Sequence, residues 1–169
     1  LLAFVAAIVL FTQRGGGGGP AAVAGDAAAP DPARAAALAS THSPLLGNPA
    51  AKVHVVEFLD PACETCAAFF PIVKDLMAQN PDRIRLSVRH VAFHEGAEYA
   101  QDRYWQTLEA LLGSQQLWAP NHTVRPELVD TAIASVGLDM QRLAADVNSP
   151  EVTERIQRDL QDAKTLRVT

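Results

Sequence analysis

The only two cysteines of this 169-residue chain stand at the C-x-x-C spacing in Cys63-Glu64-Thr65-Cys66. A thiolate attacks a disulfide sulfur, and a second thiol within reach resolves the mixed disulfide, so this spacing is typical of a dithiol redox site. A bridge between the two would close a loop of only about four residues, which contributes little to stability. The pair therefore indicates chemistry rather than a structural disulfide.

The flanking residues predict a turn between a strand and a helix. Residues 52–59 are apolar and β-branched, as in a strand buried on both faces, and residues 66–79 have helical periodicity. Pro71 falls inside that helix and is expected to kink it or shift its register. Cys63 would lie at the helix N-terminus, which favours a thiolate, and Cys66 one turn further in. This arrangement makes Cys63 the attacking thiol and Cys66 the resolving thiol.

The residues between the cysteines modulate the site. A helix N-terminus stabilises a nearby anion by at most about 2 kcal/mol, so Glu64 and Thr65 must supply any further effect. An ionised Glu64 opposes a neighbouring thiolate. The sequence therefore predicts a moderate oxidant, or an exchanger of disulfides, rather than an extreme oxidant.

Glu57 stands within the predicted strand, ahead of Cys63. Acids are rarely buried without a reason, and a buried Glu57 would accept the proton that Cys66 loses when it resolves a mixed disulfide. The alternative is an acid at the strand end with its carboxylate in solvent. The residue alone leaves both interpretations open.

The rest of the chain predicts one α/β domain. Residues 83–91 alternate with a period of two and complete a right-handed βαβ unit with parallel strands, in which the arginines form a solvated face. Helices are expected over residues 98–112, 126–136, 139–148 and 149–164, the last with Ser149 as its cap. Some large apolar residues are expected in the core of this helical section, namely Trp105, Leu108, Leu111, Leu117 and Trp118.

The N-terminal part has a different composition. Residues 1–13 are expected to be a truncated membrane anchor or signal segment, because their apolar run is shorter than the roughly 20 residues that span a bilayer. Residues 14–41 are rich in Gly, Ala and Pro and predict a flexible linker. The folded domain is expected over residues 42–169. The net charge of −5 argues against a nucleic-acid partner.

A metal site is the main alternative. Cys63, Cys66, His90 and His94 have the ligand types of a zinc site, and the two cysteines with one histidine would suit copper. The predicted strand ends at residue 91, so His94 lies beyond it and no regular element places the two histidines on one face, which disfavours this alternative. The remaining histidines, His42, His54 and His122, are interpreted as surface or packing residues.

The order of these parts resembles the thioredoxin fold in its DsbA-like form. Residues 55–66, with the strand, the acid and the C-x-x-C motif, and residues 84–89, with the second strand, match that family's pattern. The resemblance implies a thioredoxin-like fold with a helical insertion at about 95–164. It also implies that Cys63 is the nucleophile, Cys66 the resolving thiol and Glu57 the buried acid.

The resemblance also implies the function. The family exchanges disulfides with extracytoplasmic proteins, needs no cofactor beyond the Cys63–Cys66 disulfide, and depends on a membrane redox partner that resets the pair. The expected location is the periplasmic side of the bacterial inner membrane. The family's cis-proline loop, C-terminal β-hairpin and last helix are expected to be missing from this chain, which would leave residues 53–59 with an open edge.

Overall fold

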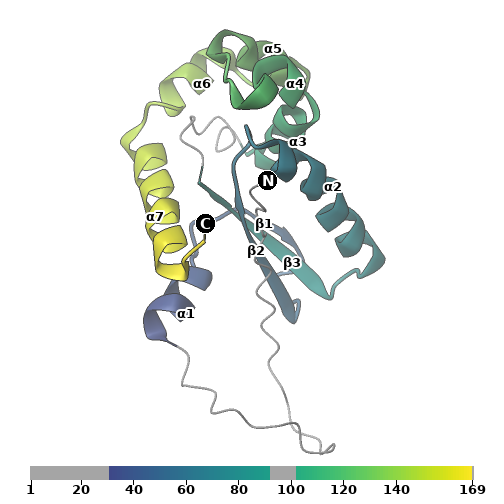
Figure 1. The fold of residues 1–169 in the computed structure, drawn as a ribbon, viewed down its shortest axis with the longest axis vertical. Coiled ribbons are helices and arrows are strands. Elements are labelled where there is room, and N and C mark those ends of the chain that lie inside the picture. The colour runs from purple at the N-terminus through teal and green to yellow at the C-terminus, as the bar shows by residue number, and fades with distance from the viewer. Residues whose placement is uncertain (1–30, 92–101, 169) are drawn as a thin grey trace, which may run out of the picture.

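The computed structural model describes residues 31–91 and 102–168, and its elements surround a small mixed sheet (Figure 1). The strand order is β1-β3-β2. Strand β2 (Val53–Leu59) runs parallel to β3 (Ile84–His90), with Val55 opposite Leu86 and Glu57 opposite Val88. This register confirms the predicted βαβ unit.

Strand β1 (Leu45–Gly47) pairs antiparallel with β3 and was not predicted. Its last residue, Gly47, has a φ of 91°, and a Cβ there would lie 2.8 Å from the Ile84 carbonyl oxygen. A residue other than glycine would clash at this position and strain the backbone. A strand of three residues is too short for its alternation to be detected in the sequence.

Helices α2 (Glu64–Gln79) and α3 (Tyr104–Gly113) cover the first face of the sheet. The core on this side is built by apolar side chains from the two helices and from the strands, namely Leu59, Phe70, Val73, Leu86, Val88, Tyr104, Leu108 and Leu112. Pro71 lies within α2, which continues past it to Gln79. Side chains alternate along a strand, so Glu57 shares this face with its neighbours Val55 and Leu59.

Helices α1 (Pro32–Leu38) and α7 (Pro150–Leu166) cover the opposite face and lie side by side (Figure 1). Arg89, expected on a solvated strand face, is only 1 % exposed because α7 covers it. Its guanidinium lies 3.0 Å from the Asp159 carboxylate and 2.8 Å from that of Asp162. The prediction of a solvated arginine face is therefore wrong for Arg89, because it assumed solvent where α7 packs.

The predicted linker contains a short helix at its C-terminal end. Residues 32–38 form α1, in which Ala37 is buried and its carbonyl oxygen accepts from Arg89 Nη2 at 2.6 Å. Asp31 caps the helix by accepting from Ala33 N. The folded unit therefore includes residues from Asp31 onward, ahead of the expected start at His42.

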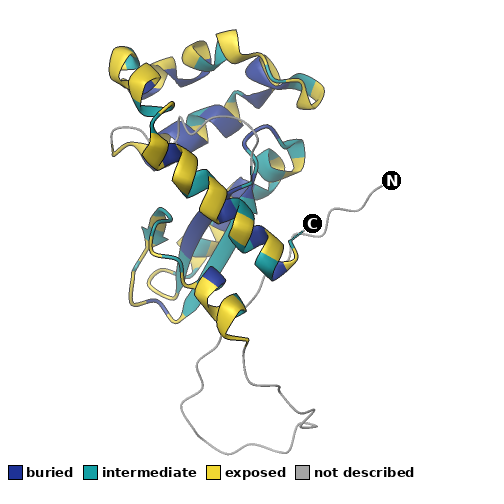
Figure 2. Ribbon diagram, turned by 90° about the vertical axis from the view of Figure 1, so that its left-hand side faces the viewer, coloured by how far each residue is buried: buried dark blue, intermediate teal, exposed yellow. Residues whose placement is uncertain are grey.

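The helical section forms one end of the molecule, with α4 (Gln115–Trp118), α5 (Val129–Ile133) and α6 (Met140–Asp146). Buried residues line its inner side, and exposed residues occupy the outer faces of the helices (Figure 2). The single helix expected over residues 126–136 is instead α5 between the 3-10 turns Pro126–Leu128 and Ala134–Val136.

Two further details concern the ends of these elements. Gly137, with a φ of 74°, ends the second of the 3-10 turns, as expected of a glycine stop. The caps Asp139 and Ser149 accept from Arg142 N and Val152 N and begin α6 and α7 where predicted.

Core predictions for the helical section were mostly confirmed. Trp118, Leu108 and Leu111 are buried, and Trp105 packs at the edge of the core. Leu117 is exposed, contrary to expectation, because the short helix α4 turns only one side inward.

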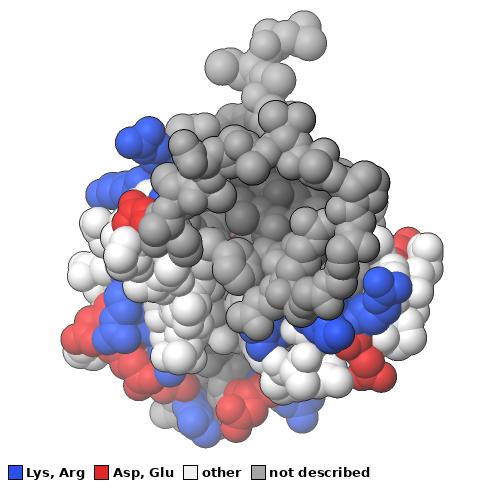
Figure 3. All heavy atoms as spheres, turned by 90° about the horizontal axis from the view of Figure 1, so that it is seen from below, with Lys and Arg blue, Asp and Glu red and all other residues white. Residues whose placement is uncertain are grey.

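The surface of the described residues is mixed in charge. Acidic and basic side chains alternate around the face drawn in Figure 3.

Within residues 31–91 and 102–168, none of the helices is long and apolar enough to cross a bilayer. The proposed anchor or signal segment at residues 1–13 lies outside the described residues.

Candidate active site

The turn before Cys63 is fixed by its own hydrogen bonds. Asp60 Oδ1 accepts from Ala62 N at 2.9 Å, and the Asp60 carbonyl oxygen accepts from Cys63 N at 3.0 Å. An Asp side chain that bonds the backbone two residues on is a frequent turn device. The chain therefore leaves β2 and reaches the start of α2 in one short, defined turn.

The helical section supports this turn from the other side. Gln115, which is 4 % exposed, donates from Nε2 to the Pro61 carbonyl oxygen at 2.7 Å. Ala62 is buried in the apolar cluster of the helical section, with Leu111 and Trp118 among its members. The helical section therefore positions the segment that leads into the cysteines.

Cys63 is the N-cap residue of α2 and its side chain makes no capping hydrogen bond. The Cys63 carbonyl oxygen accepts from Ala67 N at 3.1 Å, so the helix begins immediately after this residue. Both cysteines are free thiols in the structure. The position of Cys63 at the helix N-terminus is the one predicted.

Cys66 lies one turn into α2 and packs against the core on the sheet side. Burial is the main cause that raises the pKa of the Cys66 thiol to about 12. A backbone hydrogen bond at Asp60 lowers this pKa, whereas the hydrogen bond and charge of Cys63 and the charge of Glu57 raise it. The two thiols therefore differ in environment, and Cys66 releases its proton only with difficulty.

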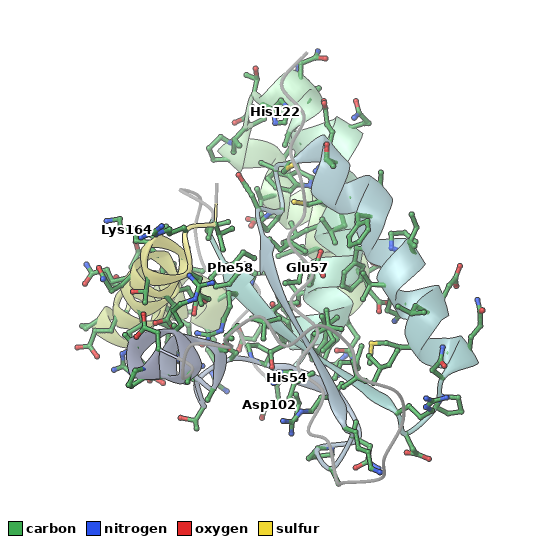
Figure 4. The ribbon with its side chains drawn as sticks, turned by 60° about the horizontal axis from the view of Figure 1, so that its bottom comes forward. His54, Glu57, Phe58, Asp102, His122 and Lys164 are labelled. Atoms are coloured by element: carbon green, nitrogen blue, oxygen red, sulfur yellow. The ribbon has the colours of Figure 1, made fainter. Side chains whose placement is uncertain are left out.

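Glu57 lies on the face of β2 that α2 covers, and Figure 4 shows it in the interior. Burial raises the pKa of its carboxyl group to about 7. Its Oε2 atom is buried and has no hydrogen-bond partner among the described residues. Of the two interpretations of Glu57, the buried acid is the one that the structure supports, because the carboxyl group lies inside the fold rather than in solvent at the strand end.

Replacing Glu57 with glutamine is expected to change stability and exchange in opposite directions. The folded pKa is raised from 4.5 to about 7, so the carboxyl group stabilises the fold below pH 4.5 and this contribution is lost as pH rises through about 7. The loss is about 3 kcal/mol, and Glu57→Gln should remove that pH dependence from urea unfolding curves.

The same substitution removes the carboxylate that is predicted to accept the proton of Cys66. Over the window around pH 7 in which the Glu57 carboxyl ionises, disulfide exchange by the wild type should accelerate with pH. The variant should be slower by about 100-fold, the usual scale for a general base, and should lack this acceleration. Unfolding curves with identical pH dependence in both proteins would contradict the burial of an ionisable Glu57.

The geometry does not favour the metal alternative. His90 is 1 % exposed, its Nε2 lies 2.6 Å from the Tyr104 hydroxyl, and burial lowers its pKa to about 4. The rings of the two residues pack edge to face. Neither cysteine belongs to a group of three metal-ligand side chains within residues 31–91 and 102–168. His94 lies outside the described residues.

The comparisons with known proteins agree with the fold. Residues 39–169 match the protein family that is described as Thioredoxin, which is more than half of the chain. The chain belongs to the thioredoxin family. Among solved structures, this thioredoxin-family chain is similar to a thioredoxin-like oxidoreductase from Silicibacter pomeroyi DSS-3, with 29 % identity and a TM-score of 0.66. That match covers 78 % of this chain and 79 % of the other.

A second structure supports the fold alone. The α-DsbA1 protein of Wolbachia pipientis is 20 % identical, with a TM-score of 0.66, over 81 % of this chain and 75 % of its own. The fold expected from the sequence, a thioredoxin-like fold with a helical section of the DsbA-like kind, is confirmed.

Two curated relatives are longer than the matched region. The thiol:disulfide interchange protein DsbA of Bordetella parapertussis is 29 % identical over 133 residues, which are 74 % of this chain and 63 % of that protein. The Na(+)/H(+) antiporter NhaA of Herminiimonas arsenicoxydans is 32 % identical over 122 residues. Those residues are 67 % of this chain and only 19 % of the antiporter.

Three site residues were missed by reasoning from the sequence. Gln115 supports the turn before Cys63, and Asn121 and His122 contact Glu64 from the helical section. Their spacing from the cysteines carries no signal, because the contacts depend on how the helical section folds back. His42 and His54, by contrast, are packing residues as expected, bonded to Asp159 and Ser87.

Proposed function

We propose that this thioredoxin-family chain carries out thiol–disulfide exchange through Cys63-Glu64-Thr65-Cys66. The observation that supports this most directly is the difference between the two thiols. Cys63 is the N-cap residue of a helix and its thiol makes no capping hydrogen bond, whereas Cys66 is desolvated and lies near a buried carboxyl group with a pKa of about 7. A structural pair of cysteines has no need of such an arrangement.

In the proposed reaction, the Cys63 thiolate attacks one sulfur of a substrate disulfide. A Cys63–substrate bond forms, the substrate S–S bond breaks, and the other substrate sulfur leaves as a thiolate. Cys66 then attacks Cys63 Sγ, which forms the Cys63–Cys66 disulfide and releases the second substrate thiolate. The substrate is reduced by two electrons and the dithiol is oxidised by two, and the reverse sequence oxidises a substrate.

Glu57 serves the second attack. The Cys66 thiol must lose its proton to become a nucleophile, and its raised pKa makes loss to solvent slow. The Glu57 carboxylate, which ionises near neutral pH, accepts this proton directly or through one water. No organic cofactor enters the reaction, because the electrons are held by the two sulfur atoms.

The substrates proposed are thiols and disulfides of extracytoplasmic proteins. Residues 1–13 would hold the domain near the periplasmic side of the bacterial inner membrane, or direct it to the periplasm, and a membrane redox partner would reset the pair. The curated relative named thiol:disulfide interchange protein DsbA supports an exchange function of this kind. Binding of copper or zinc by the same thiols is the alternative function, and the geometry around His90 does not favour it.

The test is a redox titration of the protein. The chain is equilibrated with a series of glutathione buffers, and the oxidised fraction of Cys63 and Cys66 is read by alkylation and mass spectrometry. We expect one two-electron transition whose midpoint is unchanged by added copper or zinc. A chain without a defined transition, or with tight metal binding that blocks oxidation, would contradict the proposal.

A further inference from the structure

The centre of the active-site motif contacts the helical section through one side chain. Glu64 Oε1 accepts from Asn121 N at 3.1 Å, and Glu64 Oε2 lies 3.5 Å from His122 Nε2. Figure 4 shows His122 at the end of the molecule where α2 begins, away from the interior position of Glu57. His122, which is distant in the sequence, therefore contacts the side chain of Glu64, the residue that follows Cys63.

The turn that carries this histidine has an unusual backbone. Asn121 and His122 both have positive φ angles, of 51° and 56°, in the short 3-10 turn Pro120–His122. Positive φ is uncommon outside glycine, and such conformations persist where the surroundings fix them, frequently near functional sites. Two consecutive residues of this kind indicate that the turn is held in place from both sides.

The base of the turn is held by the buried core. Arg125 N donates to the Trp118 carbonyl oxygen at 2.6 Å, and Trp118 Nε1 donates to the Leu111 carbonyl oxygen at 2.8 Å. Trp118 is 3 % exposed. The tip of the turn, Asn121 and His122, is held from α2 by Glu64. Within the described residues, no other residue of α2 makes a hydrogen bond or ion pair with these two.

The pair adds little to folding stability, because both side chains are open to solvent. His122 is 63 % exposed and Glu64 40 % exposed, and ion pairs in such positions contribute little to stability. We therefore expect its effect on the charge at the N-terminal end of α2, where Cys63 is the N-cap residue. A carboxylate next to Cys63 disfavours the thiolate of the reduced form, whereas a nearby imidazolium favours it.

We propose that Glu64 is a positioning residue that holds the ring of His122 at the N-terminal end of α2, where Cys63 is the N-cap, so that the imidazolium form of the ring makes the dithiol a stronger oxidant than a Glu-Thr centre alone allows. This inference rests on the proposed exchange function and adds a determinant of its redox poise. It also changes the interpretation of Glu64. The Glu64 carboxylate has two partners in the helical section, the Asn121 amide and the His122 ring, rather than standing alone in solvent.

The test compares the reduction potentials of charge variants at pH 6, within the range in which imidazole binds a proton. His122→Gln should disfavour the reduced form about threefold, a shift of about 14 mV toward a more reducing couple. Glu64→Gln removes the charge but keeps an oxygen for Asn121 N. It should favour the reduced form about threefold, a shift of about 14 mV toward a more oxidising couple. In the Glu64→Gln background, His122→Gln should change the equilibrium by less than a factor of two, because the ring is no longer held there.

A matched control and a second measurement complete the experiment. Arg125→Gln removes an exposed positive charge from the same segment and should leave the potential unchanged. Glu64→Ala should expose the Asn121 amide to rapid hydrogen exchange, and Glu64→Gln should restore its protection. Equal shifts for the His122 and Arg125 variants, or an Asn121 amide that exchanges alike in both Glu64 variants, would overturn the inference.

Failure of this inference is distinguishable from failure of the proposed function. The potential is measured against glutathione and needs no protein substrate. A wild-type chain that forms no Cys63–Cys66 disulfide would refute the proposed function itself. A chain that forms the disulfide with a potential that ignores Glu64 and His122 would refute only the positioning role.

Discussion

Replacing Cys66 with serine is expected to stop exchange at the mixed disulfide. The variant keeps the Cys63 thiol at the start of α2, so the first attack on a substrate disulfide still takes place. The second attack has no nucleophile, because a serine hydroxyl does not displace a thiolate. Turnover of a protein disulfide substrate should fall by about 10³-fold or more, the scale reached when a covalent nucleophile is removed.

Measurements on the partner variants separate the two roles. Non-reducing electrophoresis should show Cys66→Ser joined to substrate through Cys63, whereas Cys63→Ser should be equally inactive and form no adduct. The double variant should lose no more activity than either single variant, because residues that act as one unit do not contribute additively. An adduct that forms at Cys66 in the Cys63→Ser variant would reverse the assignment of attacking and resolving thiols.

The part of the site that the sequence predicted is local in the chain. Glu57, Cys63 and Cys66 lie on one strand–turn–helix segment, so the alternation along β2 and the start of α2 fix their relation. The parallel pairing of β2 with β3 follows from the length of the connection and was predicted for the same reason.

The part that the sequence did not predict depends on contacts between distant segments. A periodicity of two along β3 says which residues share a face, but not whether a helix covers that face, so Arg89 was expected in solvent. The contact of Glu64 with the Pro120–His122 turn likewise depends on how the helical section packs on Ala62. Broken helices such as 126–136 escape detection because their apolar spacing is the same as that of one continuous helix.

The contacts of Arg89 lead to the second prediction of large effect, which concerns stability. Asp159 is fully buried and accepts from Arg89 Nη1 at 3.0 Å, from His90 N at 2.9 Å and pairs with His42 Nε2 at 2.7 Å. These bonds join α7 to β3 and to the segment before β1. This one carboxylate thus joins α7 to three residues, in addition to the ion pair that Asp162 makes with Arg89.

Replacing Asp159 with alanine should therefore destabilise the chain by about 3–5 kcal/mol, the usual cost of breaking a buried ion pair by removing one of its partners. The guanidinium of Arg89 would retain Asp162, but the backbone N–H of His90 would lose its acceptor. A loss of this size is a large fraction of the roughly 5–15 kcal/mol that holds a typical domain folded. Urea unfolding should show a lower midpoint with an unchanged slope.

Two variants on the same helix provide the comparison. Asp162→Asn removes a charge that is 22 % exposed and should cost about 1 kcal/mol, because solvent screens it. Glu154→Ala removes the exposed pair with Arg158 and should cost less than about 0.5 kcal/mol. The order Asp159, Asp162, Glu154 follows the burial of each carboxylate. If Asp159→Ala unfolded at the same urea concentration as Glu154→Ala, α7 would not be held to β3 by this carboxylate, and the ion pairs around Arg89 would be incidental to the fold.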